Sequence, residues 1–296
     1  MEAASVPAPA EATRARTKTR KPPRQGTPPW MWLAVFAIVV FCLFPFYWLV
    51  NTSLKTGTDL SSASLLPPNP TLKNFEAIFK DSNFTLALRN SAIVALVTTT
   101  LALLVGSFCA YALARLRLRF KFAILAIILS ITTFPQITIA APIFKLWRDI
   151  GLFNTIPGLI IPNLTFALPL ATYILTSFFR EIPKDLEEAA LVDGATNLEA
   201  FRKIVIPLAA PGLATAGILT FIAVWNEFLL AITLTSNSDA RTVPAAIAFF
   251  TGSTQFEKPL GTISAASVVI SVPLIIAVLL FQKRIVAGLT AGAVKG

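Results

Sequence analysis

The sequence has 296 residues, of which 55% are hydrophobic and 14% charged, with a mean hydropathy of +0.72 and a formal net charge of +10. This composition is far more apolar than that of a soluble globular domain, so it predicts an integral membrane protein. With no histidine and only two cysteines, the chain cannot build a haem site, a Cys/His zinc site or a histidine proton relay, and we expect it to bind no metal.

The first 29 residues are rich in Ala, Pro, Thr and Arg and contain six lysines or arginines. They have too few large apolar side chains to form a core, which predicts a disordered basic tail. The apolar run that follows is long and does not end in small residues of the Ala-x-Ala type. We therefore expect the first span to remain in the mature protein and not to be removed as a signal peptide.

Six apolar runs are long enough to cross a bilayer core of about 30 Å as helices. This predicts an all-α protein with a transmembrane domain over residues 30–286. The predicted spans are Trp30–Leu54, Asn90–Ala114, Phe122–Leu146, Ile156–Phe179, Leu208–Leu234 and Ile263–Phe281. Several spans contain proline, which either kinks a packed helix or marks a moving pathway.

The basic residues are distributed unevenly between the two sides of these spans. Of the 25 lysines and arginines, 17 lie in the tail, the even-numbered connections and the C-terminus, and 8 lie in the other connections. The positive-inside rule therefore places both termini in the cytoplasm. The placement of these cations beside membrane lipid also explains the net positive charge, so nucleic-acid binding is not needed to explain it. The outer connections are too short for a domain, so any soluble substrate receptor must be a separate polypeptide.

The connection over residues 181–207 is polar but carries helix signals. Pro183 suits the first position of a helix, and Gly194 can take the left-handed conformation that ends one, so we predict a helix over residues 183–193. Thr196 and Glu199 have the spacing of a capping box, which predicts the start of a second helix.

One face of the first loop helix combines Leu186, Ala189, Ala190 and Asp193 at helical spacing. The paired alanines allow another surface to approach closely, which favours a docking surface that passes the movement of a partner to the spanning helices. An amphipathic connector that rests on lipid headgroups has the same pattern, so both interpretations remain open at this point.

The same connection contains Glu188, Ala189, Ala190, Gly194, Ile204 and Pro207 at fixed distances from one another. This pattern resembles the EAA signature of binding-protein-dependent ABC import permeases. Ile206 departs from it, since the signature usually has Leu there, but the change conserves volume.

The resemblance covers nearly the whole chain after residue 29. Over this length the chain is similar to the shorter permease subunit of maltose-type carbohydrate importers. The segments 134–137, 250–257 and 285–296 look most like the trehalose permeases of mycobacterial importers. The resemblance implies the type I ABC importer permease fold in a prokaryotic plasma membrane and a disaccharide substrate, with trehalose favoured. Maltose or another oligosaccharide, or a glycerol phosphate, is the alternative.

The resemblance further implies a complex of two permeases, two ATPase subunits and an extracytoplasmic sugar-binding protein. The EAA residues and Asp193 would then contact the ATPase, and the C-terminal tail over residues 287–296, with Gly292 and Lys295, would approach it as well. The chain lacks a phosphate loop of the Gly-Lys-Ser/Thr type. We therefore expect it to have no catalytic residue and no cofactor of its own, with ATP and Mg²⁺ held by the ATPase subunits.

A polar group interrupts the fifth predicted span at Trp225, Asn226 and Glu227. Charge within a bilayer is costly unless it faces protein or water, and an aromatic ring beside an amide and a carboxylate could bind a sugar. A structural hydrogen bond to a neighbouring helix is the alternative. Gln136 and Asn163 are weaker candidates for the same pathway, and Asn163 could instead satisfy backbone freed by a proline.

A secondary transporter and an intramembrane enzyme are the alternatives to an ATP-driven permease. A secondary transporter would be expected to show internal repeats and midplane carboxylates, and the sequence has no convincing repeat. An intramembrane enzyme would need catalytic groups such as histidine, a Gly-x-Ser-x-Gly elbow or paired aspartates, and none of these is present in the spans.

Overall fold

The computed structural model describes residues 28–250 and 259–293, and all regular structure in this part of the chain is helical. In chain order the helices are α1 (Pro29–Ser53), the 3₁₀ helix η1 (Gly57–Ser61), α2 (Lys73–Lys80), α3 (Ser82–Arg115), α4 (Lys121–Thr133), α5 (Gln136–Asp149), α6 (Ile156–Glu181), α7 (Asp185–Val192), α8 (Asn197–Ala200), the π-helix η2 (Phe201–Val205), α9 (Ile206–Leu208), α10 (Ala210–Trp225), α11 (Leu229–Leu234), α12 (Val243–Ala248) and α13 (Leu260–Ala293).

The chain divides into two compact units, residues 1–45 and 46–296. The first unit contributes the beginning of α1, a helix without a charged side chain that matches the first predicted span. In the second unit, α2 is fastened to the end of α1 by Asn74. Its amide Nδ2 donates to the carbonyls of Ser53 and Lys55, each at 2.8 Å.

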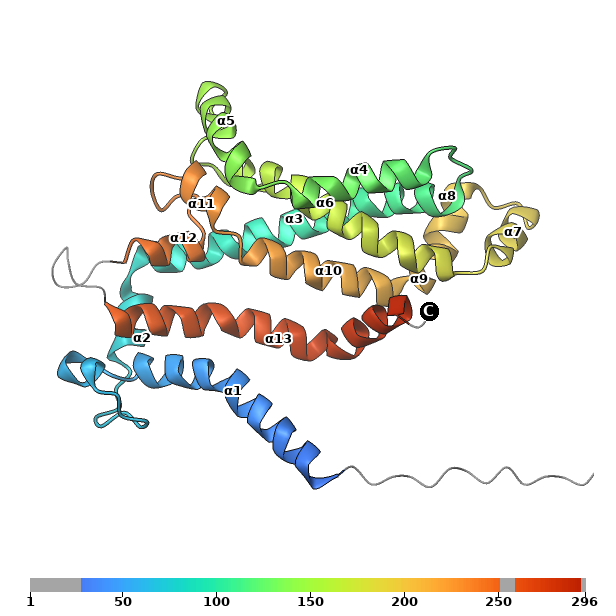
Figure 1. Cartoon of the computed structure of the whole chain (residues 1–296). Helices are drawn as coiled ribbons and strands as arrows, with labels where there is room; N and C mark the ends of the chain where they lie inside the picture. Colours follow the sequence, from blue (N-terminus) through green and yellow to red (C-terminus); the bar gives the residue numbers. More distant parts are fainter. Residues whose placement is uncertain (1–27, 251–258, 294–296) are drawn as a thin grey trace, which may run out of the picture. The chain divides into compact units, whose positions relative to one another are not determined.

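The long helix α3 packs along α6, and α10 packs against both (Figure 1). Small residues make the close approach possible, as is usual between membrane helices. A Cβ added at Gly106 of α3 would lie 3.3 Å from the Cβ of Ala171 in α6. α3 begins at Ser82, eight residues before the predicted span, because Asp81 caps it by accepting a hydrogen bond from the amide of Asn83 at 2.9 Å.

The third predicted span consists of two helices, α4 and α5, which meet at 83°. A second bend, of 75°, separates the segment Asn197–Leu208 from α10 and lies at the start of the fifth predicted span. Pro135 stands at the first break, where it cannot donate the hydrogen bond that would continue α4. Within the described residues, four helices are long and apolar enough to cross a membrane, or up to six if each bent pair is one span.

The fifth predicted span also ends early, because α10 stops at Trp225 and the chain restarts as the short α11. α13 packs against α10 and α2. It continues as one helix to Ala293, so residues 287–293, which the sequence assigned to a tail, are helical.

In α6, the carbonyl of Gly158 is freed because Pro162 has no N–H. It accepts a hydrogen bond from the indole Nε1 of Trp147 at 2.6 Å. Trp147 belongs to α5, so this bond also ties the bent α4–α5 pair to α6.

Candidate functional site

The connection over residues 181–207 folds into the two predicted helices. α7 begins at Asp185, two residues after Pro183, and ends before Gly194, whose φ of +90° is left-handed. The amides of Gly194 and Ala195 donate to the carbonyls of Leu191 and Ala190, which satisfies the last turn of α7. Gly194 therefore ends the helix as the sequence predicted.

The capping box at the start of α8 is present in both directions. The hydroxyl of Thr196 accepts from the amide of Glu199 at 3.3 Å, and the carboxylate of Glu199 accepts from the amide of Thr196 at 3.0 Å. The Thr196 amide, together with hydrogen bonds from Lys203 and the Thr196 hydroxyl, lowers the pKa of Glu199 to about 2. The turn between α7 and α8 is thus closed by local bonds.

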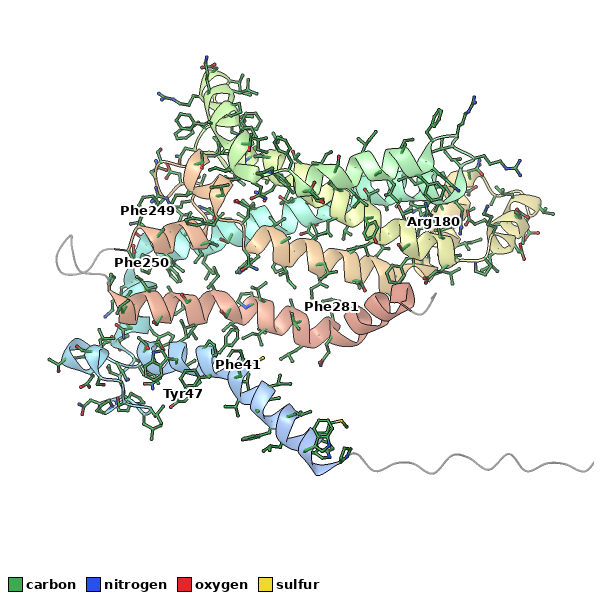
Figure 2. The ribbon with its side chains drawn as sticks, viewed as in Figure 1. Phe41, Tyr47, Arg180, Phe249, Phe250 and Phe281 are labelled. Atoms are coloured by element: carbon green, nitrogen blue, oxygen red, sulfur yellow. The ribbon has the colours of Figure 1, made fainter. Side chains whose placement is uncertain are left out.

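Most of the predicted docking residues lie at the surface of this loop. Leu186, Glu188, Ala189 and Asp193 are exposed, and Ala190 is half-buried. We call these five residues the loop face. Figure 2 shows Arg180, the penultimate residue of α6, at the same end of the molecule.

Glu187, the neighbour of Glu188, is a functional candidate that the sequence reasoning missed. Its side chain points inward, where its carboxylate forms an ion pair with Arg115 and accepts a hydrogen bond from the hydroxyl of Tyr111 at 3.0 Å. Arg115 also donates to the carbonyl of Ile182 at 3.0 Å. Both charged side chains are less than a tenth exposed, so α7 is attached to the end of α3 by a buried ion pair.

Phe201 attaches the second half of the loop to the same two spanning helices. Its ring lies 4.8 Å from that of Tyr111 in α3 and 6.2 Å from that of Phe179 in α6, measured between centroids. The signature residue Ile204 is half-buried in η2, and Pro207 is exposed in α9. The second half of the loop is therefore packed against both α3 and α6.

The polar group of the fifth predicted span is drawn into local structure. Trp225 is buried, and its indole donates to the carbonyl of Ile270 in α13 at 3.2 Å. Glu227 accepts hydrogen bonds from the amides of Leu230 and Ala231 at 2.7 and 3.1 Å, at the start of α11. These contacts favour the structural interpretation for both residues, with Glu227 acting on its own segment and not on a neighbouring helix.

The remaining pathway candidates are bonded within their own segments or only half-buried. Asn226 is exposed and donates to the carbonyl of Ile222 in its own helix at 2.8 Å. Asn163 is buried and donates to the carbonyl of Leu159 at 3.0 Å, while the carbonyl that Pro162 frees is satisfied by Trp147. Gln136 is half-buried in the first turn of α5. Lys295 and the segment 251–258 lie outside the described residues, and Gly292 lies in α13.

The sequence and the fold can be compared with those of known proteins. The family model of the binding-protein-dependent transport system inner membrane component matches residues 102–290, which include the whole loop. The chain belongs to this family. It is accordingly a multi-pass component of the inner membrane and a non-catalytic subunit of an ABC transporter.

Three relatives refine the place of the chain within the family. A trehalose transport system permease protein of Mycobacterium tuberculosis is 51% identical over 90% of this chain and 97% of its own length. A sulfoquinovosyl glycerol transport system permease protein of Agrobacterium fabrum is 44% identical over 90% and 94%. A trehalose/maltose transport system permease protein of Thermococcus litoralis is 39% identical over 89% and 95%. The chain is therefore a permease of the carbohydrate-importer group.

The fold agrees with this assignment. A chain in the crystal structure of a bacterial ABC transporter for the import of alginate superposes with a TM-score of 0.70 at 23% identity, covering 86% of this chain and 95% of its own. The type I ABC importer permease fold that the sequence predicted is confirmed. The bent helix pairs lie within this fold.

Proposed function

We propose that the chain is a permease subunit of an ATP-driven importer of a disaccharide, and that trehalose is its substrate. Two relatives that cover most of the chain are named for trehalose, which supports this choice. The relative named for sulfoquinovosyl glycerol supports a different glycoside as the second candidate. Maltose and other oligosaccharides, and glycerol phosphate, complete the set to be tested.

In this proposal the loop face docks onto the ATPase subunit. The observation that carries it is the contrast between Glu188, which is exposed, and Glu187, which is buried against Arg115. An exposed surface whose helix is attached to α3 by an ion pair can transmit the force of a moving partner without losing its own structure. Four residues of the loop face, Glu188, Ala189, Ala190 and Asp193, would form the contact together with Gly194, and Ile204 and Pro207 would support it.

The force from the ATPase subunit would reach the spanning helices by two routes. One runs from Glu187 through Arg115 into α3, and the other runs from Phe201 to α6 and through η2 into the bend before α10. ATP and Mg²⁺ belong to the ATPase subunits in this proposal, and this chain only transmits the energy of hydrolysis.

We further propose the arrangement of the complex. It would contain a second permease, two ATPase subunits and an extracytoplasmic sugar-binding protein, with both termini of this chain in the cytoplasm. The end of α13, including Gly292, and Lys295 beyond it would approach the ATPases. Trp225, Asn226, Glu227, Gln136 and Asn163 remain candidates for the sugar pathway, of which the exposed Asn226 has the best access to it.

The test is uptake by the complete complex in proteoliposomes. Labelled trehalose, maltose and sulfoquinovosyl glycerol are supplied with the binding protein, and ATP is placed on the ATPase side. Uptake of trehalose above the others is expected, together with its loss when an ATPase variant cannot hydrolyse ATP. Uptake driven by a proton gradient without ATP would contradict the proposal, and preference for another sugar would replace trehalose.

A further inference from the structure

Two adjoining cavities lie at the end of α3 that is opposite to the loop. Each has a volume of about 280 Å³, and Asp81, Asn83, Phe249 and Phe250 line both. α3 has 34 residues and is therefore about 50 Å long, so the cavities and the loop face lie on opposite sides of a bilayer. Figure 2 shows Phe249 and Phe250 at one end of the molecule and Arg180 at the other. We call the two spaces the distal cavities.

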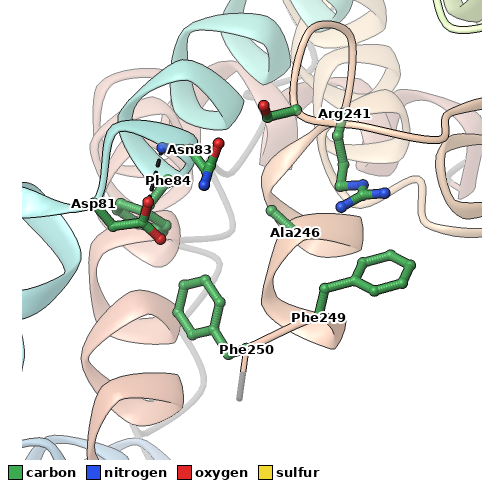
Figure 3. A pocket seen from close by; sticks show the side chains of 8 residues that line it. Asp81, Asn83, Phe84, Arg241, Ala246, Phe249 and Phe250 are labelled. Carbon is green, nitrogen blue, oxygen red and sulfur yellow. Dashed lines mark hydrogen bonds between the residues drawn. The ribbon is translucent and has the colours of Figure 1, made fainter. Parts of the chain in front are cut away.

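Polar groups of both charges face the first of these cavities. Asp81 comes from the start of α3, and Arg241 comes from the connection between α11 and α12 (Figure 3). The carboxylate of Asp81 accepts one bond from the amide of Asn83, and a carboxylate offers about four acceptor positions. Acceptor capacity is therefore left for a ligand.

Arg241 is held in place but retains donors. Its guanidinium lies 3.9 Å above the centre of the Phe249 ring, and its Nη2 donates to the carbonyl of Ser236 at 2.9 Å. Its Nε is buried and has no partner among the described residues. A guanidinium carries five N–H groups, and a buried donor without a partner is costly. A ligand hydroxyl that accepts from this group would remove that cost.

The wall that carries Arg241 is fixed to α3 by four hydrogen bonds. The amide of Asn90 donates to the carbonyls of Ser238, Asp239 and Arg241 at 3.2, 2.9 and 3.2 Å. The hydroxyl of Ser91 accepts from the amide of Val243 at 2.8 Å. These bonds therefore hold the two walls of the first cavity at a fixed separation, as a preformed binding site requires.

Aromatic rings complete the surface. Phe84 and Phe250 pack edge to face with centroids 6.0 Å apart, and Phe249 carries the guanidinium of Arg241. Rings beside a few fixed polar groups are the usual composition of a small-molecule pocket. A pyranose matches this set, because its C–H faces pack on aromatic rings while its hydroxyls both donate to carboxylates and accept from guanidinium groups.

We propose that the distal cavities are a receiving site for a disaccharide, with one sugar ring in each cavity. The inference rests on the proposed function, in which sugar arrives on this side of the membrane from the binding protein. The carboxylate of Asp81 disfavours an anionic ligand, and a single carboxylate is too few for a metal ion. Two spaces of equal volume with a shared rim fit two rings better than one extended chain.

The test measures sugar binding to the assembled complex in nanodiscs without the binding protein, by equilibrium dialysis of labelled trehalose and labelled maltose. Asp81→Asn keeps the helix cap, since Asn caps as well as Asp, but it removes the charge. Phe249→Leu removes the ring beneath Arg241. Asp59→Asn is the matched control, because Asp59 lies in η1 and lines neither cavity. Size-exclusion chromatography checks assembly.

The expected result is millimolar binding of at least one sugar to the parent complex. This binding should weaken about tenfold in Asp81→Asn, as loss of a hydrogen bond to a charged group predicts. It should weaken by a similar factor in Phe249→Leu, because the aromatic face that packs on the sugar is lost, and stay unchanged in Asp59→Asn. Unchanged sugar binding in the two cavity variants would overturn the inference. So would loss of docking of the binding protein without a change in sugar binding, because the cavities would then hold a side chain of that protein.

Failure of the proposed function gives a different signature. A parent complex that takes up none of the sugars with ATP and binding protein would contradict the importer proposal in the uptake assay. A complex that takes up trehalose or maltose but binds neither without the binding protein would leave the importer proposal standing and overturn the receiving site.

Discussion

Arg115, the last residue of α3, and Glu187, in the first turn of α7, form a buried ion pair between positions 72 residues apart in the sequence. Among the described residues it is the one ion pair between the loop and a spanning helix. Glu187 directly precedes Glu188, the first residue of the EAA signature. The contribution of this ion pair to stability can be measured separately from the binding of the ATPase subunit to the loop face.

We predict that Glu187→Ala destabilises the chain by about 3–5 kcal/mol, because it leaves Arg115 as a buried charge without its partner. Uptake should fall about tenfold or more, since α7 would no longer move with α3. Thermal unfolding of the purified complex and an uptake assay measure the two effects. Glu76→Ala is the control, because its pair with Lys80 is exposed and such pairs contribute only about 0–1 kcal/mol.

A double variant separates stability from coupling. Arg115→Leu combined with Glu187→Leu removes both charges, and replacing a buried ion pair with apolar residues is often neutral or stabilising. We expect its unfolding temperature to recover while uptake stays low. Recovery of both would show that simple packing at this position is sufficient for transport.

The second prediction concerns Gly194. A Cβ at this position would meet no atom within 4 Å, so its left-handed φ of +90° is the main obstacle to a side chain. Gly194→Ala should cost about 1–2 kcal/mol and loosen the end of α7. Gly194→Asn is the matched control, because Asn tolerates this conformation better. Binding of the ATPase subunit should weaken about fivefold in the first variant and less in the second; equal binding by both would argue against docking through a rigid α7.

The loop shows how far the sequence alone can lead. Gly194 and the Thr196–Glu199 capping box were predictable because they are local signals that depend on a few neighbouring residues. The inward turn of Glu187 was not, since two adjacent glutamates look equivalent until the partner Arg115 is known. The fold class followed from the apolar runs. The one available hint to the partner of Glu187 was that Arg115 is the first cation after one of these runs.

The spans show where hydropathy fails. A window that averages about 20 residues cannot tell one straight helix from two that meet at 83°, so α4 and α5 appeared as a single span. Glu227 was placed correctly near an interruption, but its role in capping α11 depends on where α10 stops. Such tertiary details override local pattern.

The third prediction is a dependence on pH at the turn between α7 and α8. The hydrogen bonds from Thr196 and Lys203 lower the pKa of Glu199 from 4.5 to about 2. A depressed pKa in the folded state means that the stabilisation is complete above about pH 4.5 and is lost as the pH falls toward 2. NMR of labelled threonine amides should show Thr196 shifting in this range. Glu199→Gln should abolish the shift, and a shift that persists in this variant would assign it to another group.

The fourth prediction distinguishes the two roles considered for the polar group near the fifth span. Glu227→Ala removes the acceptor for the amides of Leu230 and Ala231, which should cost about 1 kcal/mol and reduce assembly. Glu227→Gln keeps an acceptor and should assemble nearly as well. Asn226→Ala, at an exposed position, should leave assembly intact and reduce uptake if Asn226 faces the sugar. Normal assembly of Glu227→Ala with lost uptake would instead favour a direct role in the pathway.

The last prediction concerns Gly212, just after the bend that leads into α10. A Cβ here would lie 2.3 Å from Cγ and 2.8 Å from Cβ of Phe178 in α6, so the two helices would have to separate. Gly212→Ala should therefore cost about 1–3 kcal/mol despite the better helix propensity of Ala. Gly217→Ala is the control in the same helix, because its Cβ would meet only the terminal methyl of Leu103 at 3.2 Å.

Rescue decides whether the contact with Phe178 is the cause. Phe178→Ala combined with Gly212→Ala removes the obstructing ring, so the double variant should regain the unfolding temperature of Phe178→Ala alone, as expected when two contacting positions are coupled. Differential scanning fluorimetry of the four proteins gives the coupling energy. Additive losses would show that Gly212 is needed for the flexibility of the bend and not for the close approach of α10 to α6.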